Sequence, residues 1–192
     1  MRRFGEPVLP GRVYRTRPGA YAIIRDGDDL LVTEQAEPQR ELQLPGGGID
    51  PGEGALRALH RECLEETGWR IRVLRRLGAY QRFTYMPEYD LWARKVCHIY
   101  LARPTLRLGP PAEDGHRALW MPIATAAGLL DSPGDRDFVA RLCPPGGRLR
   151  RIHEQTQAKS MVYYRFQRGG RGGVAARGGP MTLRLPRFIQ AC

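Results

Sequence analysis

The sequence predicts an α/β fold in which helices flank one mixed β-sheet. Strand-like and helical segments are interspersed over residues 20–142, without the strict alternation that a doubly wound parallel sheet requires. Apolar residues make up 42% and charged residues 27% of the 192-residue chain, which suits a single globular core. No run of 18 apolar residues occurs, so a membrane-spanning helix is not expected.

A β-hairpin and a further short strand are predicted first. Residues 20–24 and 30–33 are apolar, and the Asp-Gly-Asp-Asp turn at 26–29 between them favours a hairpin. A third apolar stretch, 42–44, stops at Pro45, which cannot donate to a strand ladder. We therefore expect three short strands in this part of the chain.

A glycine-rich loop and a helix are expected next. Residues 46–54 are rich in glycine, and the pattern then changes to a helical period over 55–67. Apolar residues at i, i+3 and i+7 predict a buried stripe made of Leu56, Leu59 and Cys63. Gly68 follows directly and is expected to end the helix.

The remaining elements complete the expected sheet and its helical cover. Two longer strands are predicted over 69–83 and 95–102, and a short strand around 119–121. Helical patterns cover 123–130 and 135–142, with a Pro-Gly pair between them. These elements favour a mixed sheet flanked by helices.

Both ends of the chain differ in composition from this folded part. We expect an N-terminal arm or edge segment over 1–17, a folded domain over 18–143 and a low-complexity tail over 144–192. The arm has no apolar stretch behind its two arginines, so a secretory signal is not predicted. The tail holds 10 of the 31 lysines and arginines, one of the 20 acids and eight of the 23 glycines. Such a segment buries little surface, so disorder is expected there.

Three carboxylates on the predicted helix are the main candidates for chemistry. Glu62, Glu65 and Glu66 stand at i, i+3 and i+4, so they share one helix face. Like charges at this spacing repel each other unless a cation lies between them. Clustered carboxylates suit Mg²⁺, with Mn²⁺ as a second candidate ion. The other interpretation of this pattern is a solvent-exposed helix face without a metal.

Several residues outside this face are candidates for substrate binding. The glycines just before the helix permit close approach of a phosphate to backbone amides at the positive helix end. Arginines contact phosphates, and aromatic rings stack on nucleobases. The predicted substrate-binding residues are Gly46, Gly47, Gly48, Arg40, Arg82 and Tyr85.

From Gly47 to Trp69 the chain resembles the Nudix box, G-x5-E-x7-R-E-U-x-E-E-x-G-U, in which U is a bulky apolar residue. Every fixed position matches, although Cys63 and Trp69 stand where aliphatic residues are more usual. The matching residues are Gly47, Glu53, Arg61, Glu62, Cys63, Glu65, Glu66, Gly68 and Trp69. The resemblance extends outward to about residue 143 and does not cover the tail.

The resemblance implies an α/β/α sandwich that hydrolyses a nucleoside diphosphate linked to another group. It implies that Glu62, Glu65 and Glu66 bind Mg²⁺, and that Glu53 and Arg61 orient the loop and the helix. It also implies a further carboxylate ahead of a late strand, for which Glu113 is the candidate, with Asp114 and Glu88 as rivals. His98 and His116 are alternative bases, with a structural role in the sheet favoured for His98.

The substrate stays open at this stage. Tyr85 and Pro87 stand 16 and 18 residues beyond Trp69, where family relatives carry markers for dinucleoside polyphosphates and ADP-ribose, respectively. An alternative is an RNA-directed protein, either a 5′-end pyrophosphohydrolase or an RNA binder, because the tail repeats Arg-Gly-Gly. The same tail composition is also expected of a functionless or read-through extension of a GC-rich gene.

Four widely spaced cysteines give neither a zinc pattern nor a disulfide framework, which favours a reducing cytoplasm. The expected partner is a small nucleotide substrate, with RNA as a second candidate through the tail. No membrane association is expected, and relatives of this family suggest a homodimer as an option.

Overall fold

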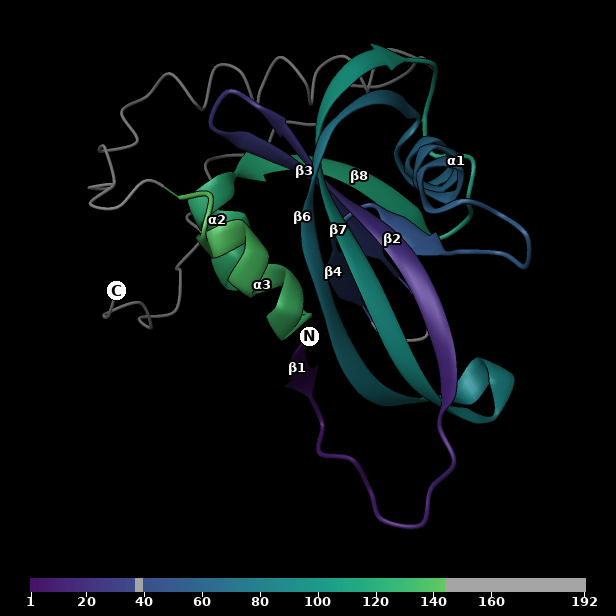
Figure 1. The fold of residues 1–192 in the computed structure, drawn as a ribbon. Coiled ribbons are helices and arrows are strands. Elements are labelled where there is room, and N and C mark those ends of the chain that lie inside the picture. Colours follow the sequence, from purple (N-terminus) through teal and green to yellow (C-terminus); the bar gives the residue numbers. More distant parts are fainter. Residues whose placement is uncertain (37–39, 144–192) are drawn as a thin grey trace, which may run out of the picture. The chain divides into compact units, whose positions relative to one another are not determined.

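The computed structural model describes residues 1–36 and 40–143, which fold into one mixed β-sheet with three α-helices (Figure 1). The elements, in chain order, are β1 (Arg2–Gly5), β2 (Arg15–Asp26), β3 (Asp29–Gln35), β4 (Glu41–Gln43), β5 (Gly46–Gly48), α1 (Ala55–Thr67), β6 (Trp69–Met86), the 3₁₀ turn η1 (Pro87–Tyr89), β7 (Leu91–Arg107), β8 (His116–Pro122), α2 (Ile123–Leu129) and α3 (Pro133–Ala140). The predicted tail lies outside the described residues. None of the described helices is long and apolar enough to cross a membrane.

The sheet is mixed, as predicted. Its main path runs β1-β6-β7-β2-β3-β4, with β5 added to β2 and β8 added to β3. The pairs β1–β6 and β2–β7 are parallel, whereas the other pairs are antiparallel. Because β8 pairs with β3 along seven residues, a segment that follows α1 by about 50 residues returns to lie beside the first hairpin.

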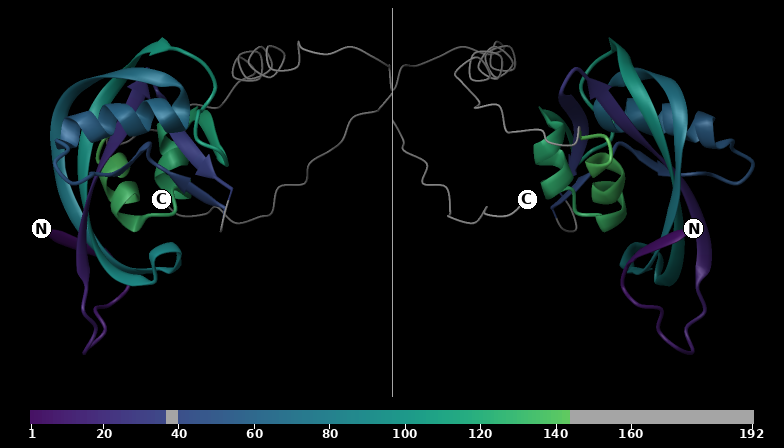
Figure 2. Two further views of the ribbon diagram at one scale, coloured as in Figure 1. Left: turned by 90° about the vertical axis from the view of Figure 1, so that its right-hand side faces the viewer. Right: turned by 60° about the vertical axis from the view of Figure 1, so that its left-hand side comes forward.

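Helices cover the two faces of the sheet, which confirms the predicted sandwich (Figure 2). Successive side chains of β2 alternate between the faces. Ala20, Ala22 and Ile24 pack in one core cluster with Leu59 and Cys63 of α1. Tyr21 and Ile23 point the other way and belong to a second cluster, which is completed by α2 and α3. The middle of β2 is therefore buried on both sides.

Helix α1 spans the predicted residues, but its buried stripe is shifted toward its C-terminus. Gly68 ends the helix in the left-handed region at φ 72°, and its N–H donates to the carbonyl of Leu64. Leu59 and Cys63 are fully buried as expected, whereas Leu56 in the first turn is 50% exposed. The stripe continues instead into Glu66, so a carboxylate occupies a core position.

Two further segments differ from the sequence prediction. The glycines 46–48, predicted as loop, form strand β5 because their backbone pairs with β2. The segment over 1–17, predicted as an arm or edge segment, contributes edge strand β1 and the first residues of β2. The strands β6 and β7 extend well past the predicted ends, because their pairing continues from Trp69–Arg107 to Met86–Leu91.

Candidate active site

Glu66 is the innermost carboxylate of α1 and is 8% exposed. Its Oε2 accepts a hydrogen bond from the backbone N–H of Gly46 at 3.0 Å and one from the Thr33 hydroxyl at 3.5 Å. Burial raises the pKa of Glu66 from 4.5 to about 8, and the neighbouring charges of Glu62 and Glu113 add to the rise. A carboxylate that is this costly to ionise is well suited to pair with a cation.

Glu62 lies close against β5 at Gly47. A Cβ atom added at Gly47 would stand 2.5 Å from the Glu62 carboxyl group, which is well inside contact distance. The side chain of Glu62 is 14% exposed. Burial raises its pKa, although Arg61 opposes the rise. The glycine of the box therefore makes room for a carboxylate above the strand.

Arg61 joins the acidic residues of the box into one network. Its guanidinium donates to Glu53 at 3.0 Å, to Glu62 at 2.9 Å and to Glu65 at 3.1 Å. It also donates to the carbonyl of Gly48 at 3.3 Å. The hydrogen bond from Arg61 is the main reason that the pKa of Glu53 is lowered. Arg61 thus ties the loop over 49–54 and strand β5 to α1.

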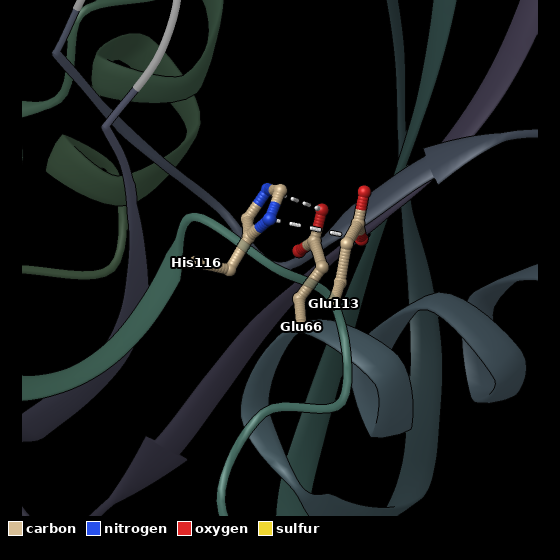
Figure 3. Close-up of side chains that lie close together, drawn as sticks. All are labelled: Glu66, Glu113 and His116. Carbon is tan, nitrogen blue, oxygen red and sulfur yellow. Dashed lines mark ion pairs between the residues drawn. The ribbon is translucent and has the colours of Figure 1, made fainter.

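Within residues 1–36 and 40–143, the side chains of Glu66, Glu113 and His116 form a compact group that could hold a metal ion (Figure 3). They come from α1, from the loop that follows β7, and from the first residue of β8. His116 Nε2 lies 3.8 Å from Glu66 Oε1, and His116 Nδ1 lies 3.8 Å from Glu113 Oε2. The loop is held beside α1 because the backbone N–H of Glu113 donates to the carbonyl of Glu65 at 3.2 Å.

This group has the donor chemistry of a divalent-cation site. One ligand atom from each of the three residues lies within 4.8 Å of the others. Two ligands on one octahedral ion stand roughly 3–4 Å apart when the metal–ligand bonds are about 2.1 Å. Two carboxylates supply the hard oxygen ligands that Mg²⁺ and Mn²⁺ prefer. Glu62 stands four residues before Glu66 on α1 and so adds a third carboxylate on the same helix face, and its charge contributes to the raised pKa of Glu66.

Other predicted residues lie away from this group. Asp114 is absent from it, and the Glu88 side chain lies outside the described part of the chain. Arg40 donates to Glu34 at 2.5 Å. Tyr85 is 40% exposed and stands at the far end of β6 from α1. His98 Nδ1 lies 3.0 Å from Arg76 on β6, as fits a sheet-surface histidine.

Arg82 lines a small open hollow on the face of the sheet that α3 covers. Asp135 is 4% exposed there and accepts a hydrogen bond from the Tyr80 hydroxyl at 2.8 Å. Burial raises the pKa of Asp135 to about 6. Burial also lowers the pKa of Lys95, and the charge of Arg82 adds to this effect. The lining residues are Tyr21, Glu41, Gln43, Tyr80, Arg82, Lys95, Cys97, Ser132 and Asp135.

The hollow and the carboxylate site are connected through strands β3 and β4. The Gln43 side chain donates to Gln35 at 2.9 Å, and Gln35 is the strand partner of His116. Lys95 and Asp135 had no signal in the sequence, since their neighbours are supplied by strand pairing and by α3. Only Arg82 among the hollow's charged residues was predicted as a substrate contact.

Residues 15–142 match the NUDIX domain family, which covers about two thirds of the chain. The chain belongs to the NUDIX family. A Bacillus subtilis relative to which 8-oxo-dGTP diphosphatase activity is ascribed is 35% identical over 74 residues, which are 38% of this chain and 50% of the relative. An RNA pyrophosphohydrolase of Helicobacter pylori is 44% identical over 57 residues, which are 27% of this chain and 37% of that protein.

A NUDIX hydrolase of Nitrosomonas europaea has the same fold, with a TM-score of 0.54 at 20% identity over 67% of this chain and 90% of that chain. The curated relatives are matched over half of their length or less. The family therefore rests on the match over residues 15–142, and the different activities of these relatives do not decide between substrates.

Proposed function

We propose that this NUDIX protein is a divalent-metal-dependent pyrophosphohydrolase. Its substrate would be a nucleoside diphosphate linked to another group, of the ADP-ribose or dinucleoside polyphosphate class. The observation that carries the proposal is the buried Glu66, which faces Glu113 and His116 at the end of a complete Nudix box. The metal is proposed to be Mg²⁺, with Mn²⁺ as an alternative, held by Glu62, Glu65 and Glu66.

The reaction would be attack of water on one phosphorus of the diphosphate, which forms a P–O bond and breaks the bridging P–O bond, so that the other phosphate leaves with its attached group. A bound divalent cation would neutralise the diphosphate and lower the pKa of a bound water. Glu113, 48% exposed at its side chain and beside Glu66, is placed to accept the water's proton on a carboxylate oxygen. Arg61 would act through position, because it holds Glu53, Glu62 and Glu65 in one arrangement.

Substrate contacts are proposed for β5 and for the hollow. Gly47 presents backbone without a side chain next to the Glu62 carboxylate, and Gly48 follows it with open space on its Cβ side. Arg82 in the hollow would meet the part of the substrate beyond the diphosphate. We leave Arg40 and Tyr85 out of this proposal, because Arg40 is paired with Glu34 and Tyr85 lies at the far end of β6.

A substrate panel tests the proposal. It contains ADP-ribose, diadenosine polyphosphates, 8-oxo-dGTP, dGTP and 5′-triphosphorylated RNA, each with Mg²⁺, and Glu65→Gln is assayed beside the wild type. Glu65 is 43% exposed at its side chain, so this variant keeps its fold. Turnover of ADP-ribose or a diadenosine polyphosphate that the variant and EDTA both abolish supports the proposed substrate class, whereas turnover of the RNA alone favours an RNA 5′ end as the substrate. Absence of turnover across the panel, with folded protein and bound metal, refutes the nucleotide class.

The second candidate substrate is the 5′ end of RNA. This candidate is favoured by the resemblance to the RNA pyrophosphohydrolase of Helicobacter pylori, which is 44% identical to this chain over 57 residues. If the Arg-Gly-Gly repeats bind RNA, affinity of the full chain should fall steeply with added salt. Replacing Arg168, Arg171 and Arg177 with Gln should then weaken RNA binding without changing turnover of a mononucleotide.

We infer a cytoplasmic location, supported by the unpaired thiols of Cys63, Cys97 and Cys143 among the described residues. A homodimer stays a prediction, which the molar mass in solution will test.

A further inference from the structure

His116 reaches the carboxylate site from a separate strand. Pairing of β8 with β3 sets His116 opposite Gln35 and brings its ring to Glu66. The side chain is 8% exposed, and its Nδ1 has no hydrogen-bond partner among the described residues. A buried polar atom without a partner costs about 1–3 kcal/mol. Its position beside two carboxylates indicates that a further group belongs between them.

The spacing around the ring fits a shared ion better than direct hydrogen bonds. Each ring nitrogen faces a different carboxylate at 3.8 Å, Nε2 toward Glu66 and Nδ1 toward Glu113 (Figure 3). Hydrogen bonds of this type are shorter, at about 2.7–3.2 Å. Ligands of one octahedral ion, in contrast, stand roughly 3–4 Å apart.

We propose that one ring nitrogen of His116 coordinates the divalent cation together with Glu66 and Glu113. Whichever nitrogen binds the ion, the other faces a carboxylate that orients the ring, as in many metal-bound histidines. The inference rests on the proposed function, because it extends the proposed metal site of Glu62, Glu65 and Glu66 by His116 and by one oxygen of Glu113, whose other oxygen can still accept the water's proton. An imidazole ligand favours first-row transition ions over Mg²⁺, so His116 should contribute more to Mn²⁺ affinity than to Mg²⁺ affinity.

Pulsed electron paramagnetic resonance of Mn²⁺ bound to the tag-free full chain tests the ligand directly. Coordinated ¹⁴N gives a hyperfine modulation, which changes to the ¹⁵N pattern when only histidine is ¹⁵N-labelled. The expected result is this modulation in the wild type. It should persist in the control His60→Gln, because His60 is exposed on α1, and disappear in His116→Ala and His116→Gln.

Binding titrations give a second readout. The concentration of free Mn²⁺ is measured from its electron paramagnetic resonance signal in solution, and the Mg²⁺ dissociation constant by competition against Mn²⁺. Loss of the His116 ring should raise the Mn²⁺ dissociation constant roughly 10- to 100-fold, with a smaller change for Mg²⁺. Wild-type protein that binds Mn²⁺ without ¹⁴N coupling overturns the inference, whether or not the variants fold.

The same experiments separate this inference from the proposed function. Metal-dependent hydrolysis without nitrogen coupling leaves the pyrophosphohydrolase intact and removes His116 from the ligand set. Protein that binds neither Mn²⁺ nor Mg²⁺ refutes both. Nitrogen coupling together with a silent substrate panel supports the ligand and refutes the proposed substrate class.

Discussion

Replacement of Glu66 by Gln should stabilise the metal-free protein while it abolishes metal-dependent turnover. Because burial raises the pKa of this carboxyl group from 4.5 to about 8, the native state holds the proton more tightly than the unfolded state does. Below pH 4.5 both states are protonated and Glu66 carries no penalty. As the pH rises toward 8, the native state becomes progressively less stable relative to the unfolded state.

The size of the effect follows from the pKa difference. At pH 7, about 2.5 pH units above the unfolded value, each unit contributes about 1.4 kcal/mol, or about 3 kcal/mol in total. The Gln amide oxygen can still accept the hydrogen bond from the Gly46 N–H, which Glu66 accepts at 3.0 Å. Its buried amide NH₂ costs about 1 kcal/mol without a full set of acceptors. The expected net gain in the free energy of unfolding is therefore about 2 kcal/mol at pH 7.

Urea unfolding in EDTA at pH 4.5, 7 and 8 measures this difference. Glu65→Gln is the matched control, because Glu65 is 43% exposed at its side chain and should change stability by less than about 0.5 kcal/mol. Addition of Mg²⁺ should stabilise the wild type by mass action, and Glu66→Gln much less. Equal stability of Glu66→Gln and wild type at pH 7, or a difference that does not change between pH 4.5 and 8, would refute the reasoning.

Three further changes have defined outcomes. Gly47→Ala places a Cβ 2.5 Å from the Glu62 carboxyl group, so metal affinity and kcat should both fall by at least about 10-fold. An unchanged metal dissociation constant would contradict this. The control is Gly54→Ala, because a Cβ at Gly54 meets nothing within 4 Å. Asp135→Asn should raise the free energy of unfolding at pH 7.5 by about 1–3 kcal/mol, because burial raises the pKa of Asp135 from 3.8 to about 6 and its ionisation is unfavourable above that pH. This gain should vanish near pH 4 in chemical denaturation, and a gain independent of pH would contradict it. Arg61→Gln should lower kcat roughly 100-fold while the circular dichroism spectrum stays unchanged, because a displacement of catalytic groups by about 1 Å lowers the rate by about that factor. Full activity of Arg61→Gln would show that Arg61 does not position these groups.

The order of elements was largely predictable from local signals. Helix α1 occupies residues 55–67 because its apolar period is bounded by a glycine-rich segment and by Gly68, which adopts the left-handed conformation that glycine tolerates. The first hairpin follows from the Asp-Gly turn between two apolar runs. These signals act within a few residues, so they can be recognised without knowledge of the tertiary structure.

Features that depend on pairing were less accessible. The glycines of β5 have no side-chain pattern, and they are a strand only because β2 lies alongside them. Strands β6 and β7 extend as far as each supplies the other with backbone partners, which neither sequence reveals alone. Leu56 follows the apolar pattern of α1, yet it is half exposed, and the polar Glu66 takes a buried position.

In the candidate site, too, residues on one helix were predictable from their spacing, whereas contacts between distant segments were not. The spacing of Glu62, Glu65 and Glu66 placed them on one helix face, whereas Glu113 was a candidate only through the resemblance to the Nudix family. The contact between His116 and Glu66 depends on the pairing of β8 with β3, across a sequence separation of about 50 residues. The hydrogen bond from Tyr80 to Asp135 spans a similar distance in sequence.

The central claim is that this chain uses a divalent cation to direct water onto phosphorus. Hydrolysis of the best panel substrate in ¹⁸O-labelled water, followed by mass spectrometry of the products, tests it most directly. We expect one ¹⁸O atom in a phosphate-bearing product of the wild-type reaction with Mg²⁺, and no turnover with EDTA or in Glu66→Gln. Label that enters a product at carbon, or label incorporation that proceeds equally without a metal, would rule out metal-directed attack on phosphorus.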